Sequence, residues 1–101
     1  MESPTRLSPT EYLILELLQD RERFGLELVE HSQGVLKRGT VYVTLARMQD
    51  KGYVSSRTEA LPLGAIGLPR RLYRPTPYGA AVFRVWSRAE RALARLRPQE
   101  A

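Results

Sequence analysis

The sequence predicts a mainly α-helical domain that also contains one small β-hairpin and ends in a long helix. Three observations favour this fold class. Ser8-Pro9 and Thr76-Pro77 each place a hydroxyl side chain before a proline, a pair typical of the first residues of a helix. Residues 53–59 are rich in β-branched and small polar side chains, and residues 71–74 alternate as strands do. The 101 residues leave room for one domain.

The first two helices are expected before residue 34. Helix 1 should span about residues 9–20, because Ser8 can cap it and Glu11 can close a capping box. A charged break follows. Helix 2 should be short, beginning near Phe24 and ending at Gly34.

A third helix is expected over about residues 37–51. Val41, Leu45 and Met48 recur at a helical spacing and should face the core, and Gly52 follows as a C-terminal cap. The opposite face mixes long basic and small side chains, namely Arg38, Thr40, Val43, Thr44 and Arg47. That face is available to a ligand.

The rest of the chain predicts a hairpin and a long helix. Residues 53–59 and 71–74 should pair around a protruding loop, residues 61–69, and the last helix should run from the Thr76 cap to about Arg97, roughly 30 Å. Its apolar seam, with spacing typical of a coiled coil, consists of Val82, Val85, Trp86, Ala89, Leu93 and Leu96. Burying this seam between two subunits would contribute on the order of 10 kcal/mol before association costs, so we expect a homodimer.

The charge is large and uneven. The net charge is +5 and the isoelectric point is about 10.1, which favours a polyanionic partner such as nucleic acid. Residues 1–30 hold three basic and seven acidic residues, whereas the remainder holds thirteen basic and four acidic ones. One end of the molecule should therefore present a basic face. A high arginine content set by genome composition is the alternative explanation.

Few residues could support catalysis or bind a metal. The sequence has no cysteine, its single histidine is His31, and it carries no glycine-rich phosphate loop. We therefore expect no metal site, no cofactor and no enzymatic activity. No apolar run approaches the roughly 20 residues that span a bilayer, and residues 1–10 lack a signal-peptide core, so a cytoplasmic protein without membrane contact is expected.

The order helix, helix, helix, strand, loop, strand, helix is that of a winged helix-turn-helix. In this fold the third helix enters the major groove and the wing lies over the DNA backbone or minor groove. We expect residues 1–76 to form the DNA-binding domain and residues 77–101 the dimerisation helix, as one continuous unit. Two such recognition helices about 34 Å apart would read a palindromic operator in double-stranded DNA.

Several short motifs, in this order, resemble the PadR-like family of transcriptional regulators. They are Leu7-Ser8, Phe24-Gly25-Leu26-Glu27-Leu28, Gly39-Thr40-Val41-Tyr42, Lys51-Gly52-Tyr53-Val54 and Arg71-Leu72-Tyr73-Arg74 with Thr76 and Gly79. The resemblance covers about residues 7–96. It implies a dimeric regulator, usually a repressor, whose C-terminal helices form the subunit interface. Pro75 departs from the family, where an apolar residue is usual, so the second strand should end there.

The resemblance and the expected wing together predict the DNA-binding residues. They are Lys37, Arg38, Thr40, Tyr42, Thr44 and Arg47 on the third helix, and Arg57, Arg70 and Arg71 on the strands. Hydroxyls and guanidinium groups at a helix start suit phosphate oxygens, and arginine can bind guanine with two hydrogen bonds. Tyr42 could equally be a core aromatic. Arg70 and Arg71 are neighbours in a strand, so only one should bind strongly.

Two further features leave alternatives open. The resemblance implies that Trp86 could contact a small planar effector, since some family members hold such molecules with aromatic side chains in this region; packing is the other interpretation. The wing tip is apolar where relatives often carry charge or glycine, with Leu61, Leu63, Ile66 and Leu68. A winged helix that docks a protein through this tip is therefore the alternative function.

Overall fold

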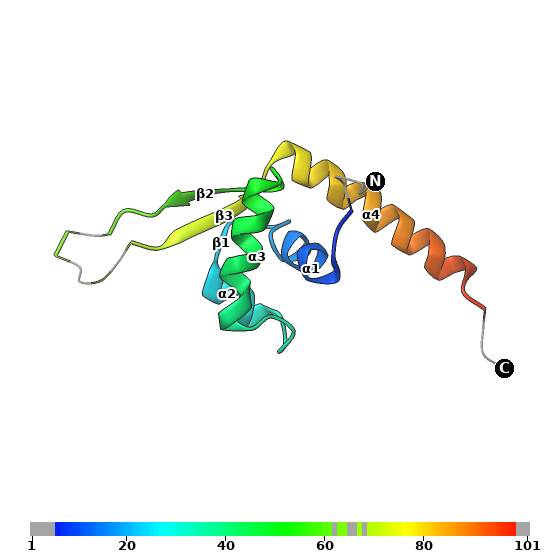
Figure 1. Ribbon diagram of the computed structural model, residues 1–101, viewed down its shortest axis with the longest axis horizontal. Helices are drawn as coiled ribbons and strands as arrows, with labels where there is room; N and C mark the ends of the chain where they lie inside the picture. The colour runs from blue at the N-terminus through cyan, green and yellow to red at the C-terminus, as the bar shows by residue number, and fades with distance from the viewer. Residues whose placement is uncertain (1–5, 62, 65–66, 68, 99–101) are drawn as a thin grey trace.

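The computed structural model describes residues 6–61, 63–64, 67 and 69–98. Its elements, in chain order, are α1 (Pro9–Leu17), β1 (Arg23–Phe24), α2 (Gly25–His31), α3 (Arg38–Asp50), β2 (Val54–Thr58), β3 (Arg71–Pro75) and α4 (Pro77–Leu96). The hairpin of β2 and β3 and the helix α4 project to opposite ends of the molecule, whose long dimension is 61 Å (Figure 1). The predicted fold class is confirmed.

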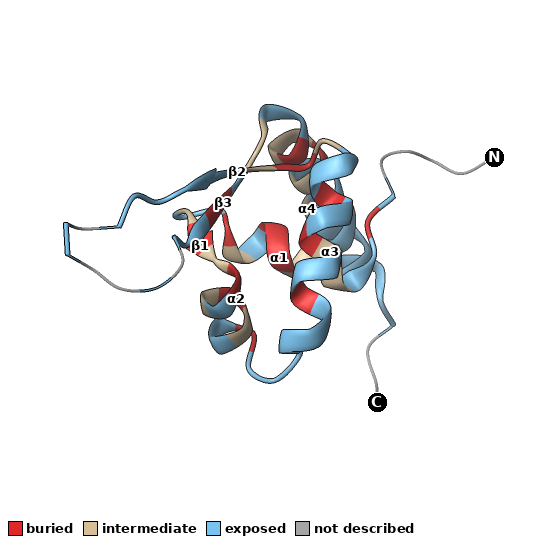
Figure 2. Cartoon of the chain, turned by 60° about the vertical axis from the view of Figure 1, so that its left-hand side comes forward, coloured by how far each residue is buried: buried red, intermediate tan, exposed pale blue. Residues whose placement is uncertain are grey.

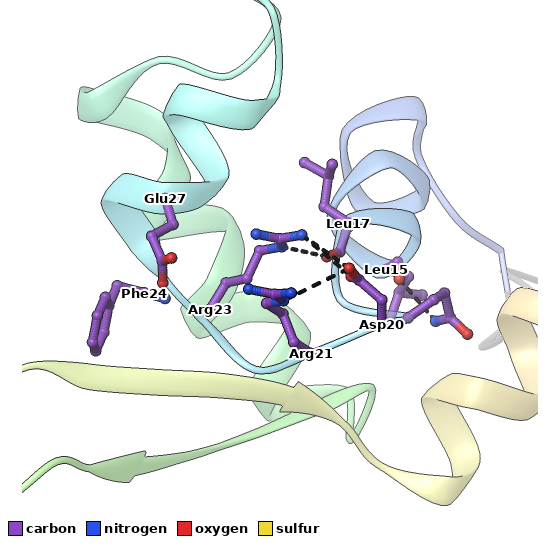
Figure 3. A network of polar contacts seen from close by, with 8 residues as sticks. Leu15, Leu17, Asp20, Arg21, Arg23, Phe24 and Glu27 are labelled. Carbon is purple, nitrogen blue, oxygen red and sulfur yellow. Dashed lines mark hydrogen bonds and ion pairs between the residues drawn. The ribbon is translucent and has the colours of Figure 1, made fainter.

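Helix α1 starts as predicted but ends earlier. The Ser8 hydroxyl accepts from the Glu11 amide at 3.1 Å, and the Glu11 carboxylate accepts from the Ser8 amide at 2.9 Å, which completes the capping box. The helix ends at Leu17, where side chains donate hydrogen bonds to its last carbonyl groups. Arg23 Nε donates to the Leu17 carbonyl at 2.7 Å, and its guanidinium also reaches Asp20 (Figure 3).

The strand β1 was not predicted from the sequence. Its two residues lie in the segment assigned to the charged break and to the start of helix 2. They pair antiparallel with β3, Arg23 opposite Tyr73 and Phe24 opposite Leu72, so that β3 is the central strand of the sheet. Two residues cannot display an alternating pattern, so no local signal marked this strand.

The core lies between the first three helices and the sheet. Figure 2 shows buried residues on the inner sides of these helices and an exposed wing beyond β2 and β3. Val41, Leu45 and Met48 are fully buried, as their spacing predicted. Tyr53 is fully buried too, whereas Tyr42 is 47% exposed and does not belong to the core.

Backbone contacts fix the start of α4. The Thr76 amide donates to the Tyr53 carbonyl at 3.0 Å, and the Thr76 hydroxyl donates to the Gly52 carbonyl at 2.5 Å while accepting from the Gly79 amide at 2.9 Å. Gly79 lies directly against the backbone of Tyr53, where a Cβ would stand 2.8 Å from the carbonyl carbon. The strand β3 ends at Pro75, as predicted.

Candidate nucleic-acid interface

The predicted contact residues of α3 lie at the surface. Lys37, Arg38, Thr40, Tyr42 and Arg47 are exposed, and Thr44 is half-buried. Lys37 is the N-cap residue and makes no side-chain capping bond. The first turn of α3 therefore presents backbone N–H groups together with two cationic side chains, a combination that suits phosphate oxygens.

The two threonine hydroxyls of α3 are already engaged as donors. Thr40 Oγ1 donates to the Lys37 carbonyl at 3.2 Å, and Thr44 Oγ1 donates to the Thr40 carbonyl at 3.0 Å. Towards a ligand they offer oxygen lone pairs and methyl groups. The reach of this helix towards a polyanion thus comes from its arginine and lysine side chains.

Tyr42 packs on the start of α2 and not in the core. Its ring lies over Gly25, where an added Cβ would stand 2.5 Å from the ring carbon Cε1. Tyr42, Phe24 and Arg70 line a groove of about 530 Å³ between α2 and β3. Because Gly25 has no side chain, the Tyr42 ring can pack beside the wing while remaining half-exposed.

A chain of hydrogen bonds links the wing to α3. Arg71 Nη1 donates to the Ser56 hydroxyl at 3.0 Å, and this hydroxyl donates to Gln49 Oε1 at 3.2 Å. Ser56 lies on β2 and Gln49 on the last turns of α3. These two hydrogen bonds join the Arg71 side chain to α3.

Arg70 precedes β3 and Arg71 is its first residue; both line the groove beside Tyr42, but they make different contacts. The Arg70 guanidinium carbon lies 4.8 Å from the centre of the Phe24 ring, a cation–π arrangement that holds it on the α2 side. Arg71 is the arginine tied to α3 through Ser56. Arg71 is thus the better placed of the two to act together with α3.

Arg57, which was predicted to bind DNA, forms an ion pair in the structure. Its guanidinium pairs with Glu22 through two bonds, Nη2 to Oε1 at 2.9 Å and Nε to Oε2 at 3.0 Å. The hydrogen bond from Arg57 lowers the pKa of Glu22 below its ordinary value; burial opposes this less strongly, and the charges of Arg57 and Arg74 add to the lowering. Arg57 is thus already neutralised by an acidic partner. This pair was not predicted, because the two residues are far apart in the chain.

Arg74 is a surface cation that the list of predicted contacts omitted. It is exposed on β3, and its Nε donates to the Ser55 hydroxyl at 3.4 Å. Alternation along β3 places it on the face of the sheet opposite to Tyr73, a signal that was available in the sequence.

The predicted interface residues of α4 fall into two groups. Val82 belongs to the core of the single chain and is only 5% exposed, so it is corrected from interface to core. The other five residues, Val85, Trp86, Ala89, Leu93 and Leu96, are exposed. The first turns of α4 rest on α1, where the Tyr12 and Phe83 rings are 5.1 Å apart, and the later turns extend into solvent.

Trp86 borders two shallow grooves beside α4. One, of about 380 Å³, lies between α4 and the start of α1 and includes Tyr12, Glu90 and Leu93. The other, of about 280 Å³, includes Tyr78 and Val85. Both are lined mainly by apolar side chains, so an aromatic molecule or a second helix would fit them chemically.

At the wing tip, Leu61 and Leu63 are exposed, Leu63 fully so. Ile66 and Leu68, the other two residues of the predicted apolar tip, lie outside the described residues.

In the part of the chain that the structure describes, no group of three or more His, Cys, Asp or Glu side chains is arranged to hold a metal ion. Over the same residues, no helix combines the length and apolar character that crossing a membrane requires.

The order of elements, with α3 exposed beside a β2–β3 wing, defines a winged helix-turn-helix protein. Residues 14–85 match the Transcriptional regulator PadR-like family, and the chain therefore belongs to this family. It is a transcriptional regulator and not an enzyme, in agreement with the sequence prediction. A search of curated proteins finds no match.

Solved structures of the same fold include three informative neighbours. A PadR family transcription regulator from Clostridium difficile shares 23% identity over 88% of this chain and 94% of its own, with a TM-score of 0.76. A putative transcriptional regulator from Thermoplasma acidophilum shares 24% identity over 86% and 85%, with a TM-score of 0.68. Bacillus subtilis PadR in complex with operator DNA shares 20% identity, with a TM-score of 0.70 over 95% of this chain; the chain spans about half of that protein.

Proposed function

We propose that this protein is a homodimeric repressor that binds a palindromic operator in double-stranded DNA, with α3 in the major groove and the wing on the backbone or minor groove. The observation that carries the proposal is the coupling of two cationic surfaces. Arg38 and Arg47 are exposed on α3, and Arg71 on the wing is joined to that helix through Ser56 and Gln49. The fold shared with Bacillus subtilis PadR, whose structure contains operator DNA, supports it.

Within this proposal, the basic residues divide into two roles. Lys37 and Arg38, at the start of α3, bind phosphates and reach base edges, since the first residues of a recognition helix contact bases. Arg71 positions the wing on the backbone through a phosphate contact. Arg57 takes no direct part, because Glu22 already neutralises it.

The proposed division of the chain follows the predicted one, with residues 1–76 as the DNA-binding domain and residues 77–101 as the dimerisation helix. Val85, Trp86, Leu93 and Leu96 leave large apolar surfaces exposed on α4. Covering them in a dimer would contribute on the order of 8 kcal/mol before association costs, at roughly 2 kcal/mol per side chain. A cytoplasmic location is part of the same proposal, because the operator is there.

The DNA proposal is tested by mobility shift at two salt concentrations, using a duplex from upstream of the protein's own gene and a scrambled duplex. Arg38→Ala and Arg71→Ala should each weaken binding roughly fivefold or more, since one good arginine contact contributes about 1–3 kcal/mol. The matched control is Arg21→Ala, which removes an exposed arginine beside Asp20 in the turn after α1. The midpoint of thermal unfolding should not fall in the three variants. Binding as tight as wild type by both test variants would contradict the site.

The dimer is tested by light scattering at micromolar concentration. Wild type should give the mass of two chains, and Leu93→Glu should give one, because a carboxylate in the seam would be buried without a partner. Leu93 is 66% exposed in the single chain, so the change leaves its core intact. A wild-type monomer would contradict the proposal.

Trp86 is proposed to contact a small planar effector where one is bound. The chain has one tryptophan, so its fluorescence reports on this position alone. Titration with a planar aromatic cation should quench it, since Glu90 shares a groove with Trp86. An unchanged spectrum at saturating concentration would leave packing as the role of this side chain.

A second candidate function is protein docking through the wing tip, favoured by the full exposure of Leu63. In that case Leu63→Ser would abolish capture of the partner, whereas Arg38→Ala would have no effect on function. Specific, salt-dependent DNA binding that is insensitive to Leu63→Ser would exclude it.

A further inference from the structure

The outermost surface of α3 is apolar at its centre. Successive residues of a helix are about 100° apart, so the positions opposite buried Val41, Leu45 and Met48 are occupied by Gly39, Val43, Ala46 and Asp50. Val43 is the large side chain in the first part of this line and is 50% exposed. Asp50, at the other end of this line, is acidic and would repel phosphates.

Val43 has no evident structural role within the chain. It is absent from the core cluster of the described residues, and half of its surface remains open to solvent. Valine is also a weaker helix former than alanine, because its branched side chain loses rotamer freedom in a helix. An exposed valine therefore contributes little to folding, and its use is better explained by what it contacts.

The surroundings of Val43 indicate the chemistry of that contact. At about 100° per residue, Arg47 borders the line directly on one side, while Arg38, in the first turn, lies further round the helix on the other side; both are exposed. The hydroxyls of the adjacent Thr40 and Thr44 donate to backbone carbonyls and leave the centre without a side-chain donor. The cationic side chains complement the anionic walls of a major groove. The apolar centre between them complements an apolar group on the floor of the groove.

The apolar group that the major groove presents is the C5-methyl group of thymine. Gly39, one turn before Val43, has no atom of the chain within 4 Å of the place where a Cβ would stand. The backbone can therefore approach the base edges closely at this point. We propose that Val43 is a specificity-determining residue that packs on the methyl group of one thymine in each half-site, an inference that rests on the proposed DNA-binding function.

The experiment removes one methyl group at a time. A duplex is selected from a random-sequence library by the wild-type protein, and each dT is replaced in turn by deoxyuridine, which lacks only the C5-methyl group. At the contacted position, binding by wild type should weaken about fourfold, the effect of one buried methyl group of about 0.8 kcal/mol, and about 15-fold when both half-sites are changed. Val43→Ala should bind the thymine and deoxyuridine duplexes with nearly equal affinity.

The matched control is Val35→Ala, which shortens another exposed valine, in the turn between α2 and α3. It should keep the wild-type preference for thymine. The proposal is overturned if a sequence is selected but every deoxyuridine change is silent, or if Val43→Ala loses as much affinity as wild type at the same position. If the folded wild-type protein selects no sequence, the proposed DNA-binding function fails, and this inference fails with it.

Discussion

The contact between Gly79 and Tyr53 allows a large destabilisation to be predicted from one methyl group. In Gly79→Ala, the new Cβ would stand 2.8 Å from the carbonyl carbon of Tyr53 and 3.0 Å from its Cα. Both atoms belong to the backbone, so no side chain can turn away. The start of α4 must therefore move away from the end of α3.

The magnitude follows from what this movement breaks. Two hydrogen bonds join Thr76 to the backbone of Tyr53 and Gly52, and losing them costs about 1 kcal/mol each. Overpacking adds about 1–3 kcal/mol, and the better helix propensity of alanine returns up to about 1 kcal/mol. The net loss in free energy of unfolding is about 3 kcal/mol, which lowers the Tm of a domain this size by roughly 12–24 °C.

The assay is thermal unfolding followed by circular dichroism at one fixed protein concentration, because the proposed dimer would make the Tm concentration-dependent. The matched control is Gly39→Ala. This glycine is also inside a helix, but nothing lies within 4 Å of its added Cβ. The control should gain about 0.5–1 kcal/mol of stability from helix propensity. A Tm for Gly79→Ala within 2 °C or so of wild type would refute the reasoning.

Two further predictions concern ion pairs. Lys51 Nζ lies 2.7 Å from the buried carboxylate of Glu11; burial alone raises the pKa of Glu11, but the hydrogen bonds from Lys51 and Ser8 and the Lys51 charge lower it below 4.5 overall. Because the folded-state pKa is lowered, this contribution to stability is present above pH 4.5 and is lost as the pH falls through the folded-state value. The free energy of unfolding, measured with urea, should therefore fall more steeply with acid in wild type than in Glu11→Gln. The same pH dependence in both proteins would contradict this prediction. Glu22→Gln should free Arg57 and increase the salt dependence of DNA binding by about one counterion per subunit. The control Glu16→Gln removes an exposed charge on α1 and should leave the slope of log affinity against log salt concentration unchanged. Equal slopes in both variants would show that Arg57 stays away from the DNA.

Most of the fold could be predicted because its signals are local. The capping residues Ser8 and Thr76 act on amides three residues ahead, and the prolines after them fix the first helical turn. The spacing of Val41, Leu45 and Met48 likewise depends only on helix geometry. These features placed three of the helices to within about one turn.

The errors occur where the outcome depends on contacts that the local residue pattern does not show. The end of α1 depends on Arg23 reaching the Leu17 carbonyl, and β1 exists only because Phe24 pairs with Leu72 of β3. Val82 was assigned to the dimer seam on its spacing, but the start of α4 is turned onto the core, and this orientation is set by the contacts of Thr76 with the preceding backbone. Periodicity identifies an apolar face but not the partner that covers it.

The sequence by itself determined the four helices, the hairpin, the basic balance of residues 31–101 and the family motifs, because each of these is a property of neighbouring residues or of composition. Only the tertiary structure decided which of the wing arginines keeps an available charge. Arg57 is neutralised by Glu22, whereas Arg71 is joined to α3 through the Ser56 hydroxyl. The physical reason is that an ion pair depends on distance in space, and the folded chain brings an acidic residue within hydrogen-bond reach of one arginine and a neutral hydroxyl within reach of the other.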